Sequence, residues 1–250
     1  MPDFRVYSPL ATAAAAELHL GAAESHHLVV VNRCSRGDPV VVFDGRGREW
    51  QCECADPAKT GAILTVRSTQ QAPARAPELT LAQALPKGAT MDEIVRQATE
   101  LGVVRIIPLL TERTQVHLDG ERAAKKVEKW HTGAVEAAKQ CGNPWLPAFT
   151  PVQKLADLLA HAGGYELKLV ASLHAGATSL RKTIETFRAK HGHAPRRVLW
   201  LVGPEGDFSP AEMTECLLAG CVPITLGPLV LRCDTAAVAA LAVVGYELNC

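Results

Sequence analysis

From residue 78 onward, short β-prone runs alternate with segments whose apolar residues recur at helical spacing. Strands and helices that alternate in this way are typical of a parallel sheet whose faces are covered by helices. We therefore expect an α/β fold for this part of the chain. The predicted strands are residues 79–85, 103–110, 167–173, 198–202 and 222–225, and the predicted helices are residues 94–101, 121–141, 154–161, 179–190, 210–219 and 235–248.

The first seventy or so residues are β-rich instead. Turn signals separate their β-prone runs. One signal, Asp44-Gly45-Arg46-Gly47, is similar to a nucleotide-binding glycine fingerprint, but a strand follows it, so it predicts a hairpin turn. Residues 70–77 have the composition of a linker, and we expect a β domain over residues 1–72 and an α/β domain over residues 73–250. The β-prone runs are residues 4–7, 28–31, 39–43, 49–54 and 62–66.

Charge and cysteine content exclude some classes of protein. With 26 basic and 26 acidic side chains, the net charge does not indicate a polyanionic partner, although residues 181–197 hold six basic side chains against Glu185 alone. A solvated surface and a phosphate-contacting patch explain that segment equally well. The eight cysteines are scattered, which predicts reduced thiols in the cytoplasm. Cys52 and Cys54 are too close for the usual zinc spacing, and we expect no metal site, signal peptide or membrane span.

Two glycine-bearing segments each follow a predicted strand and precede a helix-like stretch. Gly203-Pro204-Glu205-Gly206-Asp207-Phe208 follows residues 198–202, and residues 226–235 follow residues 222–225. At the ends of neighbouring strands, two such loops would offer backbone N–H and C=O groups to a small ligand. Arg232 would place a fixed positive charge beside that pocket. The alternative is that both loops are only tight turns.

Other chemical interpretations fit less well. Leu85-Pro86-Lys87-Gly88 lacks the glycine fingerprint of a dinucleotide-binding fold. Cys233 beside Arg232 suggests a nucleophile, but no base neighbours it in the sequence. His26 and His27 on a strand would point to opposite faces, which favours a structural or RNA-contacting role over a metal site.

Several further motifs occur in the order in which one family of enzymes has them. They are Glu24-Ser25-His26-His27-Leu28, Phe43-Asp44-Gly45-Arg46-Gly47, Ala84-Leu85-Pro86-Lys87-Gly88, Ala98-Thr99-Glu100-Leu101-Gly102-Val103 with Pro108, and Glu136-Ala137-Ala138-Lys139-Gln140-Cys141-Gly142. Together with the two glycine loops, these motifs make the whole chain resemble the bacterial 16S ribosomal RNA (uracil-N3)-methyltransferases of the RsmE type, within the SPOUT superfamily.

The resemblance implies an N-terminal PUA-like β-barrel that binds RNA, followed by a SPOUT domain with a parallel sheet and a deep C-terminal trefoil knot. It also implies a homodimer, and binding of S-adenosylmethionine (SAM) in the knot. Carried over by motif, the cofactor contacts are Leu173, His174, Leu201, Val202, Gly203, Pro204, Glu205, Gly206, Leu226, Gly227, Leu229 and Leu231.

The implied reaction is SAM-dependent methylation of uracil N3 of a specific uridine in 16S rRNA of the small ribosomal subunit. N3 is a poor nucleophile until it loses its proton, and Arg232 would stabilise the charge that then develops on the neighbouring carbonyl oxygens. Asp234 or Glu205 would accept the proton or orient Arg232, and the sequence does not separate these roles. The residues expected to contact RNA are Arg5, His27, Arg33, Arg36, Arg46 and Arg48.

The chain departs from the family pattern near the predicted site. Relatives usually have Arg where Leu229 stands, Gly where Asp207 stands, and Thr-Glu where Cys233-Asp234 stands. Two alternatives therefore stay open beside the implied reaction. One is a SPOUT methyltransferase that acts on another RNA site, and the other is a catalytically silent RNA-binding or ribosome assembly factor.

Overall fold

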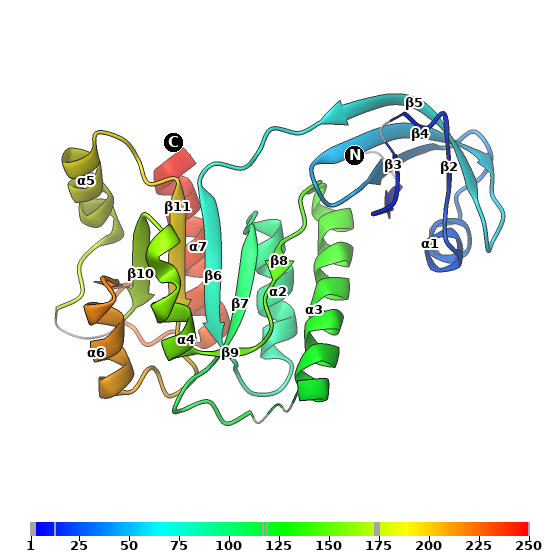
Figure 1. Ribbon diagram of the computed structural model, residues 1–250. Helices are drawn as coiled ribbons and strands as arrows, with labels where there is room; N and C mark the ends of the chain where they lie inside the picture. Colours follow the sequence, from blue (N-terminus) through cyan, green and yellow to red (C-terminus); the bar gives the residue numbers. More distant parts are fainter. Residues whose placement is uncertain (1–3, 13, 117, 119, 173–175, 250) are drawn as a thin grey trace. The chain divides into compact units, whose positions relative to one another are not determined.

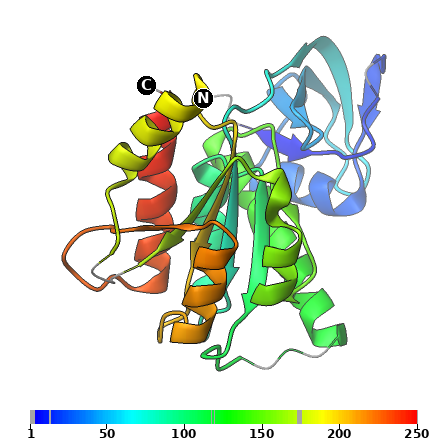
Figure 2. The same cartoon turned by 60° about the vertical axis from the view of Figure 1, so that its left-hand side comes forward.

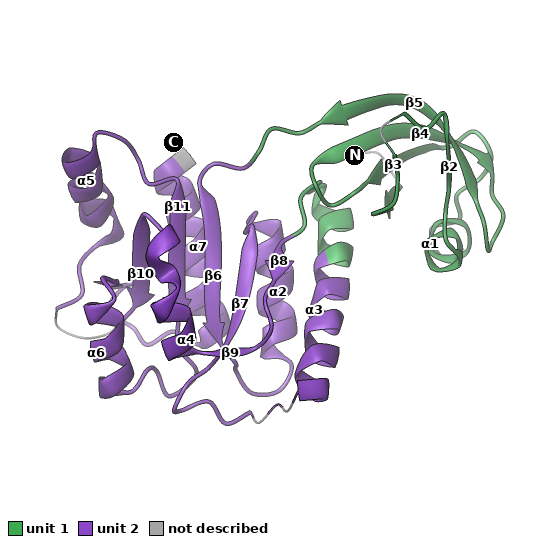
Figure 3. Cartoon of the chain, viewed as in Figure 1, with its two compact units in different colours: residues 1–74, 135–146 green, residues 75–134, 147–250 purple. Residues whose placement is uncertain are grey.

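The computed structural model describes residues 4–12, 14–116, 118, 120–172 and 176–249 (Figure 1). The chain splits into two compact units. The first unit, green in Figure 3, comprises residues 1–74 and 135–146, and the second, purple, comprises residues 75–134 and 147–250. One helix, α3 (Gly120–Cys141), contributes its last turns to the first unit and its earlier turns to the second.

A five-stranded sheet forms the first unit, with the strand order β1-β3-β4-β5-β2. β1 pairs with β3 in parallel, and the other neighbouring strands are antiparallel. Trp50 and Leu64 are buried in its core because alternate residues of the strands face inward, and Leu28, from a helical segment, packs in the same core. The strands are β1 (Arg5–Tyr7), β2 (Glu17–His19), β3 (Pro39–Phe43), β4 (Arg48–Asp56) and β5 (Ile63–Gln71).

The predicted strand over residues 28–31 is wrong, because these residues belong to a helical segment. α1 (Ala22–His26) continues directly into η1 (His27–Val31), a short π-helix. Leu28 is buried, whereas Val31 is 57% exposed, so the run does not fill a sheet position with its apolar side chains. The β-propensity of the valines is a packing preference, and local helical hydrogen bonds override it here.

A parallel sheet forms the second unit, which confirms the predicted α/β fold. Its strand order is β12-β10-β11-β6-β7-β8, with β9 also paired to β7. The sequence pattern does not predict β8 and β9, which have two residues each. The strands are β6 (Glu78–Ala84), β7 (Arg105–Leu110), β8 (Ala148–Phe149), β9 (Gln153–Lys154), β10 (Leu167–Ala171), β11 (Arg197–Val202) and β12 (Val222–Ile224).

Helices cover both faces of this sheet (Figure 2). Trp200 of β11 packs in one core with α2 (Thr90–Glu100), α5 (Leu180–His191) and α7 (Cys233–Asn249). Its neighbours Leu199 and Leu201 pack in the other core with α4 (Leu155–Ala160) and α6 (Pro210–Leu218). The trefoil knot implied by the resemblance stays a prediction. A further short helix, η2 (Ala162–Gly164), follows α4.

The beginning of α6 follows from local sequence. Ser209 Oγ accepts a hydrogen bond from Glu212 N at 3.3 Å, and Glu212 Oε2 accepts one from Ser209 N at 2.9 Å. Pro210 occupies the first turn, where its missing N–H is not needed. This capping box satisfies N–H groups that the helix leaves free, and it ends the first glycine loop at a defined position.

Candidate active site

A pocket lies at the carboxyl ends of β10, β11 and β12, where parallel α/β proteins bind ligands. β10 lies between the two strands that carry the glycine loops, so the prediction that these strands are neighbours is wrong. Both loops nevertheless meet around the end of β10. The lining residues are Ala171, Ser172, Val202, Gly203, Pro204, Glu205, Asp207, Leu226, Leu229, Val230, Leu231, Cys233 and Ala236.

The first glycine loop folds back on Gly203. Asp207 has a positive φ of 59°, and its N–H donates to Pro204 O at 2.9 Å. Its carboxylate Oδ1 accepts a hydrogen bond from Phe208 N at 2.8 Å. A Cβ atom at Gly203 would lie 3.0 Å from Asp207 Oδ1 and 3.1 Å from Phe208 N. A side chain at this position would therefore press on the loop's own atoms, and the bare backbone of Gly203 lines the pocket.

Two residues outside the loop hold its carbonyl groups. Arg113 Nη1 donates a hydrogen bond to Gly206 O at 2.6 Å. Gln83, which is fully buried at the end of β6, directs Nε2 toward Gly203 O at 3.4 Å. Sequence reasoning does not find either residue, because 93 and 120 positions separate them from their partners and no motif marks them.

Among the described residues of the pocket lining, the ionisable groups are Glu205 and Asp207 of the first loop, and Cys233. Glu205 is exposed, and its Oε1 accepts a hydrogen bond from Lys87 N at 2.9 Å. Burial, followed by the nearby charge of Glu205, raises the pKa of the Cys233 thiol to about 11. A thiol that stays protonated is not an activated nucleophile, so the structure argues against covalent chemistry at Cys233.

The second glycine loop gives the pocket an apolar and exposed wall. Gly227 has a φ of 121°, a conformation that side chains rarely adopt, and its N–H donates to Thr225 Oγ1 at 3.2 Å. Leu229 and Val230 are 72% and 81% exposed although they line the pocket. Leu231 packs partly against the core of the second unit.

Arg232 and Asp234 flank Cys233 where α7 begins. The Arg232 side chain is exposed, and its carbonyl oxygen accepts a hydrogen bond from Ala236 N at 2.7 Å in the first helical turn. Asp234 Oδ1 accepts a hydrogen bond from Thr235 N at 2.8 Å. Their backbone is therefore fixed by the helix, while the guanidinium group remains accessible to a ligand.

Some predicted cofactor contacts have a different environment from the pocket lining. Leu201 is fully buried in the core on the α4 and α6 side, so only its backbone is available to a ligand. Leu173 and His174 lie outside the described residues. Ser172, which the sequence does not indicate, follows β10 and lines the pocket.

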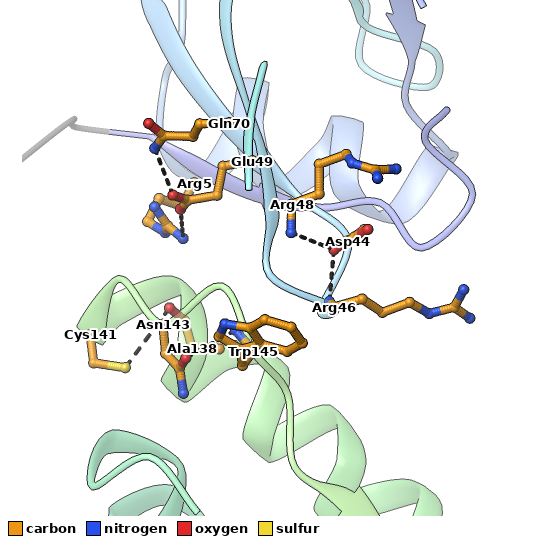
Figure 4. Close-up of polar contacts among 10 residues, drawn as sticks. All are labelled: Arg5, Asp44, Arg46, Arg48, Glu49, Gln70, Ala138, Cys141, Asn143 and Trp145. Atoms are coloured by element: carbon orange, nitrogen blue, oxygen red, sulfur yellow. Dashed lines mark hydrogen bonds and ion pairs between the residues drawn. The ribbon is translucent and has the colours of Figure 1, made fainter. Parts of the chain in front are cut away.

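Arg5, predicted to contact RNA, has a structural role in the first unit (Figure 4). Its Nη2 lies 2.7 Å from Glu49 Oε1, and its side chain is only 11% exposed. Its guanidinium also lies over the Phe43 ring, 5.1 Å from the ring centroid. Glu49 Oε2 accepts a further hydrogen bond from Gln70 Nε2 at 2.9 Å. Because Arg5 is paired and covered, we leave it out of the proposed RNA contacts.

Arg46 lies on the predicted hairpin turn, which the structure confirms between β3 and β4, and Arg48 is the first residue of β4. Asp44 Oδ1 accepts hydrogen bonds from the backbone N–H of Arg46 at 2.7 Å and of Arg48 at 3.1 Å (Figure 4). Gly47 N donates to Pro144 O at 3.0 Å, and a Cβ atom at Gly47 would collide with the Trp145 ring. The turn is thus rigid, and the exposed Arg46 side chain extends away from it.

The other predicted RNA contacts differ in exposure. Arg33 is exposed and has a φ of 61°. Arg36 is 74% exposed, with Nη2 3.9 Å from Asp56 Oδ1. His27 is half-buried and belongs to η1, not to a strand. A shared RNA surface of these residues stays a prediction.

The described part of the chain lacks two further features, a metal-binding cluster and a membrane-spanning helix. No group of three or more His, Cys, Asp or Glu side chains is arranged there to hold a metal ion. Nor does any helix among those residues have the length and apolar character needed to cross a membrane.

The fold and the pocket define a β-rich unit and an α/β unit with a ligand site at the carboxyl ends of its parallel strands, and comparison with known proteins gives the class of protein. Residues 74–245 match the family model of an RNA methyltransferase domain, and residues 20–67 match that of an RNA methyltransferase PUA domain. The chain is 32% identical to ribosomal RNA small subunit methyltransferase E of Synechocystis, over 94% of this chain and 74% of the relative. With the Bacillus subtilis enzyme of that name it shares 31% identity over 90% of this chain and 88% of the relative. The chain therefore belongs to the family of ribosomal RNA small subunit methyltransferase E.

Solved structures are similar over almost the whole chain. A methyltransferase from Legionella pneumophila in complex with SAM has a TM-score of 0.86 and 30% identity, covering 97% of each chain. Ribosomal RNA small subunit methyltransferase E from Neisseria gonorrhoeae, bound to SAM, has a TM-score of 0.84 and 27% identity, covering 97% of this chain and 96% of that one.

Proposed function

We propose that this protein methylates uracil N3 of one uridine in 16S rRNA of the small ribosomal subunit, with SAM as methyl donor. The observation that supports this most is the pocket that both glycine loops build at the carboxyl ends of β10, β11 and β12. It occurs in a chain whose structural relatives from L. pneumophila and N. gonorrhoeae are bound to SAM.

The pocket lining has the chemistry that this cofactor requires. Backbone groups at Gly203 and apolar side chains at Leu226 and Leu231 suit the adenosine part, and the Glu205 carboxylate suits a positively charged sulfonium. Cys233, protonated at neutral pH, adds no competing charge. The proposed contacts are Leu201, through its backbone, with Val202, Gly203, Pro204, Glu205, Gly206, Leu226, Gly227, Leu229 and Leu231.

When bound, SAM supplies an electrophilic methyl group. The remaining task is to make uracil N3 nucleophilic, and we assign it to the residues that precede and begin α7. The guanidinium of Arg232 is positively charged at any physiological pH, so it would stabilise negative charge on the uracil carbonyl oxygens. Asp234 and Glu205 are the two candidates for accepting the N3 proton. Each carboxylate already accepts one backbone hydrogen bond, Glu205 from Lys87 N and Asp234 from Thr235 N, so both remain candidates for accepting the proton or orienting Arg232.

We further propose that residues 1–72 bind RNA, that residues 73–250 form a knotted SPOUT domain, and that the protein acts as a cytoplasmic homodimer. The exposed Arg46 and Arg33 and the half-buried His27 support RNA binding by the first domain. In the second, the exposed apolar side chains of Val243 and Tyr246 on α7 favour a covering second copy.

Methyl transfer to small subunits from a strain that lacks this gene tests the proposal. Radiolabelled SAM should label 16S rRNA, and reverse transcription should stop at one uridine, since an N3 methyl group blocks the Watson–Crick edge. Label at another position would favour a different RNA site. An absence of SAM binding in calorimetry would identify a silent RNA-binding factor instead.

A further inference from the structure

A second cavity, of about 370 Å³, lies at the amino ends of β10 and β12, two of the strands whose carboxyl ends form the cofactor pocket. Lys168 near the start of β10 and Gly220 before β12 line it on one side, and α5 lines it on the other. Ser172, at the carboxyl end of β10, lines the cofactor pocket. Four residues at a strand rise of roughly 3.3 Å separate Lys168 from Ser172, so the two cavities are about 13 Å apart along β10.

The basic residues of α5 separate into two stripes. Lys182 and Lys190, eight residues apart and therefore on one side of the helix, line the second cavity. Arg181 and Arg188 instead contact Glu247 of α7: Arg181 Nη2 lies 2.9 Å from its Oε1, and Arg188 Nη2 lies 3.3 Å from its carbonyl oxygen. Four of the six basic residues of the segment 181–197 thus lie on α5 and fall into two pairs. One stripe is tied to α7, and the other faces an open cavity.

The cavity wall is built to present these charges. Phe187 is buried beneath it and stacks on His191, with ring centroids 4.3 Å apart. Lys168 Nζ donates to Ala219 O, which fixes the ammonium group and leaves two of its three N–H donors for another partner. Three lysines, Lys168, Lys182 and Lys190, therefore line one cavity.

Acidic side chains do not cancel this charge. Glu166 is the one carboxylate among the described residues of the lining. Its Oε2 already accepts a hydrogen bond from Arg196 N at 2.6 Å, which holds the pKa of this carboxyl below its ordinary value. The lining still has an excess of positive charge, which is what a phosphate group requires.

We infer that this cavity, the α5 groove of Lys168, Lys182 and Lys190, binds a backbone phosphate of the substrate RNA. The inference rests on the proposed function, because it assumes an RNA substrate, and it adds a contact surface outside the first domain. A few nucleotides of single strand span the distance from the cofactor pocket. The groove would therefore hold the flank of the RNA while the target uridine enters the pocket, and it would contribute affinity rather than sequence recognition.

The test compares two double variants of the same helix. Binding of a short fluorescein-labelled single-stranded RNA is measured by anisotropy at several salt concentrations. Lys182→Ala/Lys190→Ala should weaken binding roughly three- to ten-fold and reduce the salt slope by roughly 0.7 for each lost contact. Arg181→Ala/Arg188→Ala removes the same charge from the other stripe and should leave both quantities unchanged. Lys182→Arg/Lys190→Arg should retain wild-type binding.

Equal losses in the two alanine pairs would mean a general charge effect and would overturn the inference, as would no loss in either pair. An acidic peptide that competes as well as RNA would assign the groove to a protein partner. Calorimetry measures the affinity of the groove for inorganic phosphate. An affinity as high as that for RNA would identify a site for free anions and overturn the inference, whereas a far lower affinity supports a site for the RNA backbone. Methyl transfer by the wild-type protein is followed separately. If the wild-type protein transfers no methyl group but the two double alanine variants still differ in RNA binding, the proposed reaction is wrong and the proposed RNA contact at the α5 groove is supported.

Discussion

Lys139 Nζ lies 2.6 Å from Glu24 Oε1 in the first unit, and the Lys139 side chain is only 7% exposed. Glu136 Oε1 lies 2.9 Å from the same ammonium group, and Glu24 Oε2 accepts a hydrogen bond from Tyr7 N at 3.2 Å. The pair joins the end of α3 to α1 across 115 residues of sequence. The ion pair gives a structural reason for two of the motifs that carry the resemblance, because Glu24 belongs to the motif of residues 24–28 and Lys139 to that of residues 136–142.

Removing one member of this pair should lower the free energy of unfolding substantially. Lys139→Ala leaves the Glu24 carboxylate without its ammonium partner in a largely covered site, and we expect a loss of about 3 kcal/mol in the free energy of unfolding. Lys129→Ala, on the same helix, removes an ammonium group that is 61% exposed beside Asp92 and should cost less than about 1 kcal/mol. Urea unfolding of both variants measures the difference, and equal losses would contradict the buried-pair interpretation.

Gly203 is expected to tolerate no side chain. Gly203→Ala places a Cβ against Asp207 Oδ1 and Phe208 N, which belong to the folded-back loop, so cofactor affinity should fall by about ten-fold or more. Gly133→Ala is the control, because Gly133 lies in α3 outside the pocket lining and an added Cβ atom there would meet nothing within 4 Å. Calorimetry with SAM compares the two. Similar affinities in both variants would show that the loop adapts more easily than its contacts indicate.

Asp207 occupies a left-handed backbone position, with a φ of 59°, which favours glycine. Asparagine tolerates this conformation and can keep the hydrogen bond to Phe208 N, so Asp207→Asn should be close to wild type. Asp207→Ala keeps the strain and loses the hydrogen bond, and we expect it to lose about 1 kcal/mol or more. Asp207→Gly should lie between them, because the relief of strain offsets the lost bond. Urea unfolding gives this order, and an alanine variant as stable as asparagine would refute it.

The parts of the fold that short sequence windows determine could be predicted, and those that depend on long-range pairing could not. The α6 capping box is readable because Ser209 and Glu212 are three residues apart. The position of β10 between β11 and β12 depends on strand pairing, which no local pattern records. For the same reason the loops were predictable as a ligand site, whereas Gln83 was not, since it meets Gly203 only after the sheet has formed.

Cys233 should react slowly with alkylating reagents until the pH is strongly alkaline. Its pKa is raised to about 11 by burial, from an ordinary value of 9.0. The folded protein therefore keeps a proton that the unfolded chain loses above pH 9, so the stability contributed by this thiol falls as the pH rises from about 9 to 11. Iodoacetamide labelling followed by peptide mapping measures the reactivity, with the half-exposed Cys141 as internal reference. Rapid labelling of Cys233 at neutral pH would contradict the prediction.

Arg232 carries the catalytic part of the proposal most directly. Its side chain is exposed and its backbone carbonyl caps the first turn of α7, so Arg232→Ala should leave the fold and the SAM affinity unchanged. The loss of charge stabilisation on the uracil oxygens should lower single-turnover methyl transfer by about 100-fold or more. Arg232→Lys keeps the charge but not the planar pair of donors, and we expect intermediate activity. Unchanged turnover in the alanine variant, measured on small-subunit RNA at saturating SAM, would remove Arg232 from the mechanism and leave Asp234 and Glu205 as the remaining charged candidates.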